Sequence, residues 1–271
     1  MSAGVSDPVS ADVSIVTNMA SGVFQSAVIR GVQEWLAPLK VDVSVLELPV
    51  PPKSAAELPP LGDGAIVLAN ALPDSILADI KAAGTAVTLV SHLAPGLGLP
   101  SVLHDNRQGM GQLAELLASR GVTSPAFIRG NPEQLDGRER ERFLQLELLR
   151  RGLELSDDHM LEGGFETGIA GSAVAEFLSH GHKCDAIVAA DYLMALEALV
   201  ALRDAGIGVP DDVSLVAFGD GPEAEAAGLT VVAADVVELG RRAARQLLAQ
   251  LGDMRLRGHT LLSTRLVLRA T

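Results

Sequence analysis

Short apolar runs alternate with segments of helical periodicity along almost the whole chain, and this alternation limits the folds that are open to it. Residues 12–18, 65–70 and 86–91 are predicted strands, whereas residues 24–39 and 74–84 repeat apolar side chains three and four positions apart and are predicted helices. Strand–helix–strand units form right-handed parallel crossovers, so a series of them builds a parallel sheet covered by helices. The sequence therefore predicts the α/β fold class.

A second series of the same kind begins near residue 105. It opens with a predicted helix at 105–121, a strand at 124–130 and a helix at 138–152, and further strand and helix pairs follow. Two consecutive series predict two Rossmann-like parallel-sheet subdomains with a ligand cleft between them.

Capping residues mark the predicted helix ends. Asp74 or Ser75 is expected to cap the helix at 74–84, and Gly84 is expected to stop it. Asp105 or Asn106 is expected to cap the next helix.

The composition is that of a folded chain without a membrane helix. Hydrophobic residues make up 48% of 271 residues, which excludes a predominantly disordered state. No apolar run reaches the roughly 18 residues of a membrane helix. Residues 1–13 lack the basic start and apolar stretch of a secretory signal. We therefore expect a cytoplasmic protein with no membrane partner.

The charge balance disfavours direct binding of nucleic acid. The formal net charge is −13, whereas phosphate backbones recruit clustered Lys and Arg. Cys184 is the only cysteine, which excludes an intrachain disulfide and a cysteine zinc cage. His180 and His182 lie in a predicted loop between a helix and a strand, and no metal site is expected there.

The chain carries none of the common catalytic motifs. It has no G-x-S-x-G elbow, no H-E-x-x-H, no P-loop, and no G-x-G-x-x-G after the first strand. An enzyme would need a nucleophile, a metal cluster or a phosphate loop at its strand ends. We therefore expect no enzymatic activity and no cofactor.

Several predicted strands end in polar residues or glycine. These positions are Asn18, Ser91, Arg129, Asp191 and Gly219. Because ligands of parallel sheets bind at the carboxyl ends of the strands, these positions are candidates for the lining of a binding cleft.

Asp191 has two interpretations. It follows the apolar run "AIVAA" and precedes the helical segment "YLMALEAL", whose first amide groups need an acceptor, so it can be an N-cap. It can also accept a hydrogen bond from a ligand at the strand end. The sequence leaves both roles open.

The order of several segments resembles the effector-binding core of the LacI/GalR transcription regulators, which is itself similar to periplasmic sugar-binding proteins. The similarity extends from about Val13 to Arg269. It rests on the segments "DNRQGMGQLAELLASRG", "AADYLMALEALVALRDAGIGVPDDVSLVAFGD", "GLTVVAADVVELGRRAARQLLAQL" and "LLSTRLVLRAT".

The resemblance implies two Rossmann-like subdomains joined by three crossover strands, with the ligand between them. Residues 1–11 would be a linker or disordered. The first subdomain would comprise residues 12–104 plus 234–260, and the second would comprise residues 105–233 plus 261–271.

The resemblance also implies partners. Members of the family sense a small effector, form homodimers, and bind operator DNA through an N-terminal helix-turn-helix and a hinge helix. The sequence given has neither element before its first predicted strand, so the DNA-binding domain is either removed or naturally missing. Effector binding would change the tilt between the subdomains.

The effector-binding residues of the family are matched at a few positions. Arg140 corresponds to the family arginine at the start of the central helix, and a guanidinium can hold a carboxylate or paired hydroxyls. Phe165 and Phe24 correspond to aromatic residues that stack on a ligand ring. Ser91 stands where an aspartate is frequent.

Three positions depart from the family pattern. Ala190, Gly219 and Ala234 stand where the family often has an amide, a carboxylate and another polar group. Each lost hydrogen-bond partner weakens a bound sugar by roughly 1–3 kcal/mol. We therefore expect an effector that is not a typical hexose, with one anionic group for Arg140 as an option.

Two other functions remain as alternatives. A stand-alone solute-binding protein of the periplasmic type would carry a signal peptide or a lipid-anchor cysteine. An enzyme would carry one of the motifs named above. A dimer in solution would favour the regulator over a monomeric binding protein.

Overall fold

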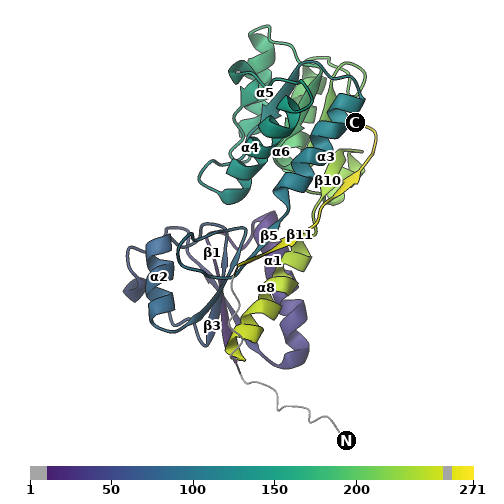
Figure 1. Ribbon diagram of the computed structural model, residues 1–271. Coiled ribbons are helices and arrows are strands. Elements are labelled where there is room, and N and C mark those ends of the chain that lie inside the picture. Colours follow the sequence, from purple (N-terminus) through teal and green to yellow (C-terminus); the bar gives the residue numbers. More distant parts are fainter. Residues whose placement is uncertain (1–10, 253–257) are drawn as a thin grey trace, which may run out of the picture. The chain divides into compact units, whose positions relative to one another are not determined.

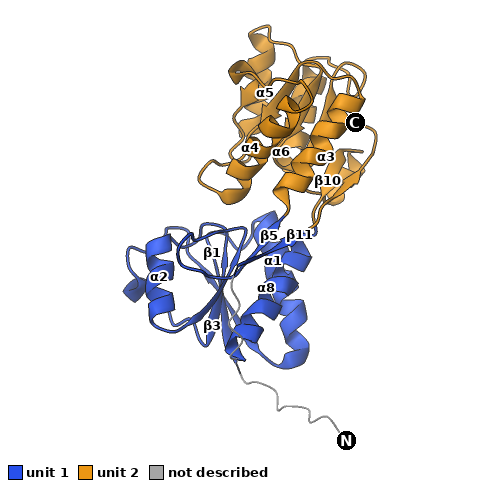
Figure 2. Cartoon of the chain, viewed as in Figure 1, with its two compact units in different colours: residues 1–104, 235–262 blue, residues 105–234, 263–271 orange. Residues whose placement is uncertain are grey.

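The computed structural model describes residues 11–252 and 258–271 (Figure 1). The chain divides into two compact units (Figure 2). Unit 1 comprises the described residues of Met1–His104 and Asp235–Leu262, and unit 2 comprises Asp105–Ala234 and Ser263–Thr271. The chain therefore passes from one unit to the other three times.

Two boundaries differ slightly from the predicted ones. The predicted division placed Ala234 in the first subdomain, whereas it belongs to unit 2. The predicted division placed Leu261 and Leu262 in the second subdomain, whereas both residues pair with Leu103 and His104 of a unit 1 strand. The predicted N-terminal linker, residues 1–11, lies outside the described residues except for Ala11, which is buried.

Unit 1 contains one six-stranded parallel sheet in the order β11-β5-β4-β3-β1-β2. Its strands are β1 (Asp12–Thr17), β2 (Asp42–Glu47), β3 (Gly64–Leu68), β4 (Ala86–Val90), β5 (Ser101–His104) and β11 (His259–Leu262).

Helices cover both faces of this sheet. They are α1 (Val23–Leu36), α2 (Asp74–Ala82) and α8 (Val236–Leu251), with short 3-10 turns at Ala37–Leu39 and Ala55–Glu57. Helices α1 and α8 lie on one face and α2 lies on the other (Figure 1). Alternate strand residues supply the two cores, since Ile66 packs on the side of α1 and α8 whereas Val67 packs on the side of α2.

Two glycines let α1 and α8 approach closely. A Cβ built on Gly31 would lie 2.0 Å from the carbonyl oxygen of Val237, and one built on Gly240 would lie 2.1 Å from that of Val28. Backbone therefore packs directly on backbone at this crossing, and no side chain fits between the helices.

Unit 2 contains a second six-stranded sheet in the order β12-β10-β9-β8-β6-β7. Its strands are parallel except for β12, which runs antiparallel to β10. The strands are β6 (Pro125–Ile128), β7 (Met160–Leu161), β8 (Ala186–Ala189), β9 (Ser214–Phe218), β10 (Thr230–Ala233) and β12 (Arg265–Val267).

The direction of each crossover in unit 2 determines which face of the sheet its helix covers. The connection from β6 to β7 runs toward one edge, and those from β7 to β8 and from β8 to β9 run toward the other. Right-handed crossovers therefore place α4 on one face and α5 and α6 on the opposite face. The helices are α3 (Asn106–Ser119), α4 (Leu135–Leu149), α5 (Ile169–Ser179), α6 (Tyr192–Asp204) and the short α7 (Pro222–Ala226), with a 3-10 turn at Asp157–His159.

The predicted α/β class with two parallel-sheet subdomains is confirmed, but one predicted cap is wrong. The N-cap position of α2 is Pro73, which makes no side-chain cap, and Asp74 is already the first helical residue. Gly84 follows the helix with φ of 86°, as expected of a helix stop. Asp105 is the cap of α3, because its carboxylate accepts a hydrogen bond from the Gln108 amide at 2.8 Å.

Within the part of the chain that the structure describes, none of the helices combines the length and the apolar character needed to cross a membrane.

The α1–α8 crossing generates a prediction for stability. The Gly31→Ala variant gains helix propensity but forces its methyl group against the Val237 carbonyl. We expect the free energy of unfolding in urea to fall by about 1–3 kcal/mol. Gly111→Ala in α3 is the matched control, because the nearest atom to its new Cβ lies 3.9 Å away. Equal stability changes in the two variants would contradict backbone packing at the crossing.

Candidate functional site

The order of the strands in each sheet indicates which strand ends are candidates for ligand binding. In unit 1, β1 connects through α1 to β2 at the sheet edge, whereas β3 connects through α2 to β4 in the other direction. In unit 2 the direction reverses between β6 and β8 in the same way. Ligands of open α/β sheets bind outside such reversal points, so residues at these strand ends are the first candidates.

Unit 1 places Asn18, Phe24 and Ser91 at or beside this edge. Asn18 follows β1 and is exposed, and Phe24 lies in the first turn of α1 and is half-buried against the core. Ser91 follows β4, is 3% exposed, and has φ of 52°. Its buried hydroxyl has no hydrogen-bond partner among the described residues, so it is available to a ligand group.

Arg140 is the centre of the candidate site in unit 2. It lies in the second turn of α4 and is 7% exposed. Its Nε donates to Asn106 Oδ1 at 3.0 Å, one terminal nitrogen donates to the Ala190 carbonyl at 2.8 Å, and the other lies 3.5 Å from Asp136 Oδ2. The guanidinium is thus held by α3, by the end of β8 and by its own helix.

Asn106 organises the charges around Arg140. Its amide nitrogen donates to Asp136 Oδ1 at 2.8 Å and to Glu139 Oε2 at 2.9 Å, while its carbonyl accepts from Arg140. The sequence indicated Asn106 only as an alternative helix cap, and it gave no role to Asp136 or Glu139. Their spacing of three residues along one helix was the available signal.

Aromatic rings flank the Arg140 guanidinium. Its central carbon lies 3.9 Å from the ring centroid of Phe218, at the end of β9, and 5.9 Å from that of Phe165. Phe165 has φ of 60°, and its ring packs so closely on Gly130 that a Cβ there would lie 2.2 Å from it. The predicted pair of Arg140 and Phe165 therefore meets in one place.

Asp191 is an N-cap in the structure. Its Oδ1 accepts hydrogen bonds from the amides of Leu193 at 2.8 Å and Met194 at 3.1 Å. Burial raises the pKa of its carboxyl above the ordinary range, and the amides and the nearby Arg140 act in the opposite direction. The capping interpretation is confirmed, and the ligand interpretation stays a prediction.

Gly219 and Asp220 have backbone and ion-pair roles. Gly219 has φ of 86°, which favours glycine, and its amide donates to the Val232 carbonyl at 2.8 Å. The Asp220 carboxylate binds Arg269 with two hydrogen bonds of 2.9 and 2.8 Å. The Asp220 carboxylate is therefore paired with an arginine of the same unit.

Arg129, another strand-end residue, also has partners of its own unit. It binds Glu141 at 2.9 Å and Glu162 at 3.1 Å. Across residues 11–252 and 258–271, no three His, Cys, Asp or Glu side chains gather to hold a metal ion.

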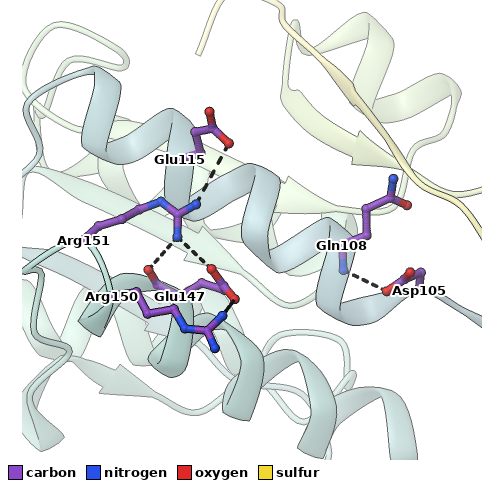
Figure 3. A network of polar contacts seen from close by, with 6 residues as sticks. All are labelled: Asp105, Gln108, Glu115, Glu147, Arg150 and Arg151. Atoms are coloured by element: carbon purple, nitrogen blue, oxygen red, sulfur yellow. Dashed lines mark hydrogen bonds and ion pairs between the residues drawn. The ribbon is translucent and has the colours of Figure 1, made fainter.

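A polar groove of about 390 Å³ runs along α3 and α4. The Glu147 carboxylate accepts hydrogen bonds from Arg150 at 2.6 Å and Arg151 at 2.8 Å, and Arg151 lies 4.0 Å from Glu115 (Figure 3). The hydrogen bond from Arg151 lowers the pKa of Glu147. Because these charges pair with one another, we assign them to the packing of α3 on α4.

Comparison with known proteins identifies the family of the chain. Residues 114–271 match the sequence profile of the family described as periplasmic binding protein-like domain. The HTH-type transcriptional regulator CelR of Thermobifida fusca is 34% identical over 166 residues, which cover 60% of this chain and 47% of that protein. The chain spans about half the length of the relatives it matches.

Solved structures of transcriptional regulators have a fold similar to that of this chain. The lac repressor dimer bound to operator and the anti-inducer ONPF has a TM-score of 0.84 at 20% identity, covering 97% of this chain and 94% of that one. The complex of the regulator CelR with cellobiose has a TM-score of 0.83 at 25% identity, covering 96% and 83%.

The buried carboxyl of Asp191 generates a prediction for pH dependence. Because its pKa is raised in the folded chain, its contribution to stability is full below the unfolded pKa of about 4 and is lost as the pH rises through the folded pKa. Asparagine caps a helix equally well and does not titrate. We therefore expect Asp191→Asn to gain stability relative to the unsubstituted chain as the pH rises from about 4 to about 7.

Urea denaturation across this pH range measures the difference. The control is Asp204→Asn, which removes an exposed carboxylate at the other end of α6. A stability difference for Asp191→Asn that stays constant with pH, or that falls, would contradict the burial effect.

Proposed function

We propose that this chain, which belongs to the periplasmic binding protein-like family as the effector-binding core of a LacI/GalR-type regulator, binds a small effector at the carboxyl ends of its strands. The family membership predicted from the sequence is confirmed, and this is a family of regulators rather than enzymes. The observation that carries the proposal is the buried Arg140 guanidinium, stacked on Phe218 where β8 and β9 end.

The surroundings of Arg140 support a neutral effector. Asp136 and Glu139 share the Asn106 amide beside the guanidinium, and Asp191 caps the neighbouring helix. Three carboxylates therefore surround one cation, and an anionic group would meet net repulsion. Asp136 already provides the carboxylate partner that the sequence alone left for the effector.

We propose further that the effector is not a plain hexose. Ala190, Gly219 and Ala234 contribute no side-chain hydrogen bonds, so hydroxyl groups near them would go unpaired. The relative CelR is known in complex with cellobiose, which makes neutral disaccharides a reasonable first class to test.

The regulatory role needs a DNA-binding part. The net charge of −13 supports a division in which operator DNA is read by a helix-turn-helix domain outside this chain, in the cytoplasm. Effector binding would then alter operator affinity through its different affinities for the states of the core.

A homodimer is supported by an apolar groove of about 810 Å³ along α5 and α6. Val200 lines it and is 57% exposed, and Ile169, which follows the lining residue Gly168 in the chain, is 42% exposed; both values are high for branched aliphatic side chains. Ala175, Leu178 and Ala201 extend the apolar lining. Exposed apolar surface of this kind is typical of subunit interfaces.

The effector proposal is tested by a thermal-shift screen of neutral mono- and disaccharides, including cellobiose, together with sugar acids and nucleobases. We expect a neutral compound to raise the melting temperature. Arg140→Lys should weaken its binding by about tenfold or more, because a lysine cannot reproduce the planar fork of donors. Arg142→Lys, an exposed change on the same helix, should leave the affinity unchanged.

Two results would contradict the proposal. Either no compound of the panel binds at millimolar concentration, or Arg140→Lys binds as tightly as the unsubstituted chain. Micromolar binding of a plain hexose, or preferential binding of sugar acids, would contradict the proposed effector class alone.

The dimer proposal is tested by sedimentation velocity. We expect Val200→Asp to weaken dimerisation by about tenfold or more, because burying an unpaired carboxylate is unfavourable. Leu149→Asp on α4, at a position 68% exposed, is the matched control and should leave the dimer intact. A monomeric parent chain, or equal effects of both substitutions, would argue against an interface at α5 and α6.

A further inference from the structure

His92 lies just after β4, and each of its two ring nitrogens is within hydrogen-bond distance of an oxygen acceptor of another residue. It is 6% exposed. Its Nδ1 lies 2.7 Å from the Ala69 carbonyl oxygen and 3.0 Å from Asn70 Oδ1, and its Nε2 lies 3.1 Å from Asp74 Oδ1. A carbonyl and a carboxylate can only accept, so both ring nitrogens must donate to satisfy them. Only the imidazolium form has both donors.

The contacts of His92 connect two strained strand ends. Ala69 after β3 has φ of 45°, and Ser91 after β4 has φ of 52°. Both residues carry a Cβ, so the left-handed conformation is unfavourable for them and requires support from the surroundings. The Ala69 amide donates to the Val90 carbonyl at 2.8 Å, and its own carbonyl accepts from His92.

Asp74 completes the arrangement from the first turn of α2. It is the charged group within hydrogen-bond distance of the His92 ring among the residues that the structure describes. The positive end of the α2 dipole would disfavour an imidazolium at this place, and the Asp74 carboxylate offsets it. Its side chain is 53% exposed, so the ion pair remains in contact with solvent.

We propose that protonated His92, paired with Asp74, is a pH-sensitive positioning residue that holds Ala69 and Ser91 in place at the carboxyl edge of the unit 1 sheet. When His92 loses its proton, one of the two ring nitrogens stops donating and faces an acceptor. The strand ends then lose support as the pH rises and the imidazolium form is lost. The arrangement itself does not depend on an effector.

One consequence does rest on the proposed function. Ser91 presents a buried hydroxyl without a partner among the described residues. An effector that bonds to it would bind more weakly at high pH, when the strand end is no longer held.

The protonation state of His92 is measured by ¹⁵N NMR of its imidazole ring, with His92→Gln used for assignment. We expect both ring nitrogens to carry protons at about pH 6. A neutral tautomer at about pH 5 overturns the proposal. This measurement needs no effector, so its failure is distinct from a failure of the effector screen.

The positioning role is measured by urea unfolding at about pH 5.5 and pH 8.5. We expect His92→Gln to raise the unfolding equilibrium constant by about tenfold at the lower pH, and by much less at the higher pH, where the interaction is already lost. Asp74→Asn keeps an acceptor without the charge and should remove most of the pH dependence. The amide signals of Ala69 and Ser91 should shift in both variants at low pH.

Matched controls separate this effect from a general loss of charge. Asp79→Asn changes an exposed carboxylate on α2, and His180→Gln changes an exposed histidine of unit 2. Both should leave the pH profile unchanged. An effect of His92→Gln that is equal at both pH values overturns the proposal. If His92→Gln does not fold, an unchanged pH profile of Asp74→Asn overturns it.

Discussion

Hydrogen bonding between parallel strands imposes the constraint on which the other features depend. Each connection between parallel strands must return across a face of the sheet, so the carboxyl ends of the parallel strands collect at one edge of each unit, with only the antiparallel β12 of unit 2 running the other way. Residues far apart in the chain, such as Arg140 and Asp191, thereby become neighbours at the edge of unit 2. The apolar bodies of the strands form the core, and polar chemistry is left to the ends.

The gathering of polar groups at the strand ends requires a charge network around the nearly buried Arg140. A guanidinium that is nearly removed from water is unfavourable unless its donors are paired and its charge is balanced. Asn106 meets both needs, because it accepts from Arg140 while binding Asp136 and Glu139. Phe218 then covers one face of the guanidinium. The result is a guanidinium whose donors and charge are met largely within its own unit, which is the basis of the proposal that the effector is neutral.

Much of the fold could be predicted from the sequence. The strand at 12–18 and the helix at 74–84 follow from local apolar periodicity, and each appears within two residues of its expected bounds. The cap on α2 could not be predicted. Asp74 has the right side chain for a cap, but the tertiary fold brings His92 to it instead, and Pro73 takes the N-cap position.

The candidate site also has features that could be predicted from the sequence and features that could not. The residue types of Arg140 and Phe165, their family positions and the capping role of Asp191 were accessible from the sequence. Arg140 and Phe165 were implied by the resemblance to the family, whereas the cap at Asp191 has a local physical basis, because its carboxyl lies between a strand and the first amides of a helix. The pairing of Asn106 with Asp136 and Glu139, the left-handed Ala69 and Ser91, and the contact of His92 with Asp74 were decided only by the tertiary structure. These contacts join segments that are distant in the chain, and hydrogen-bond geometry between them exists only once the sheets have formed.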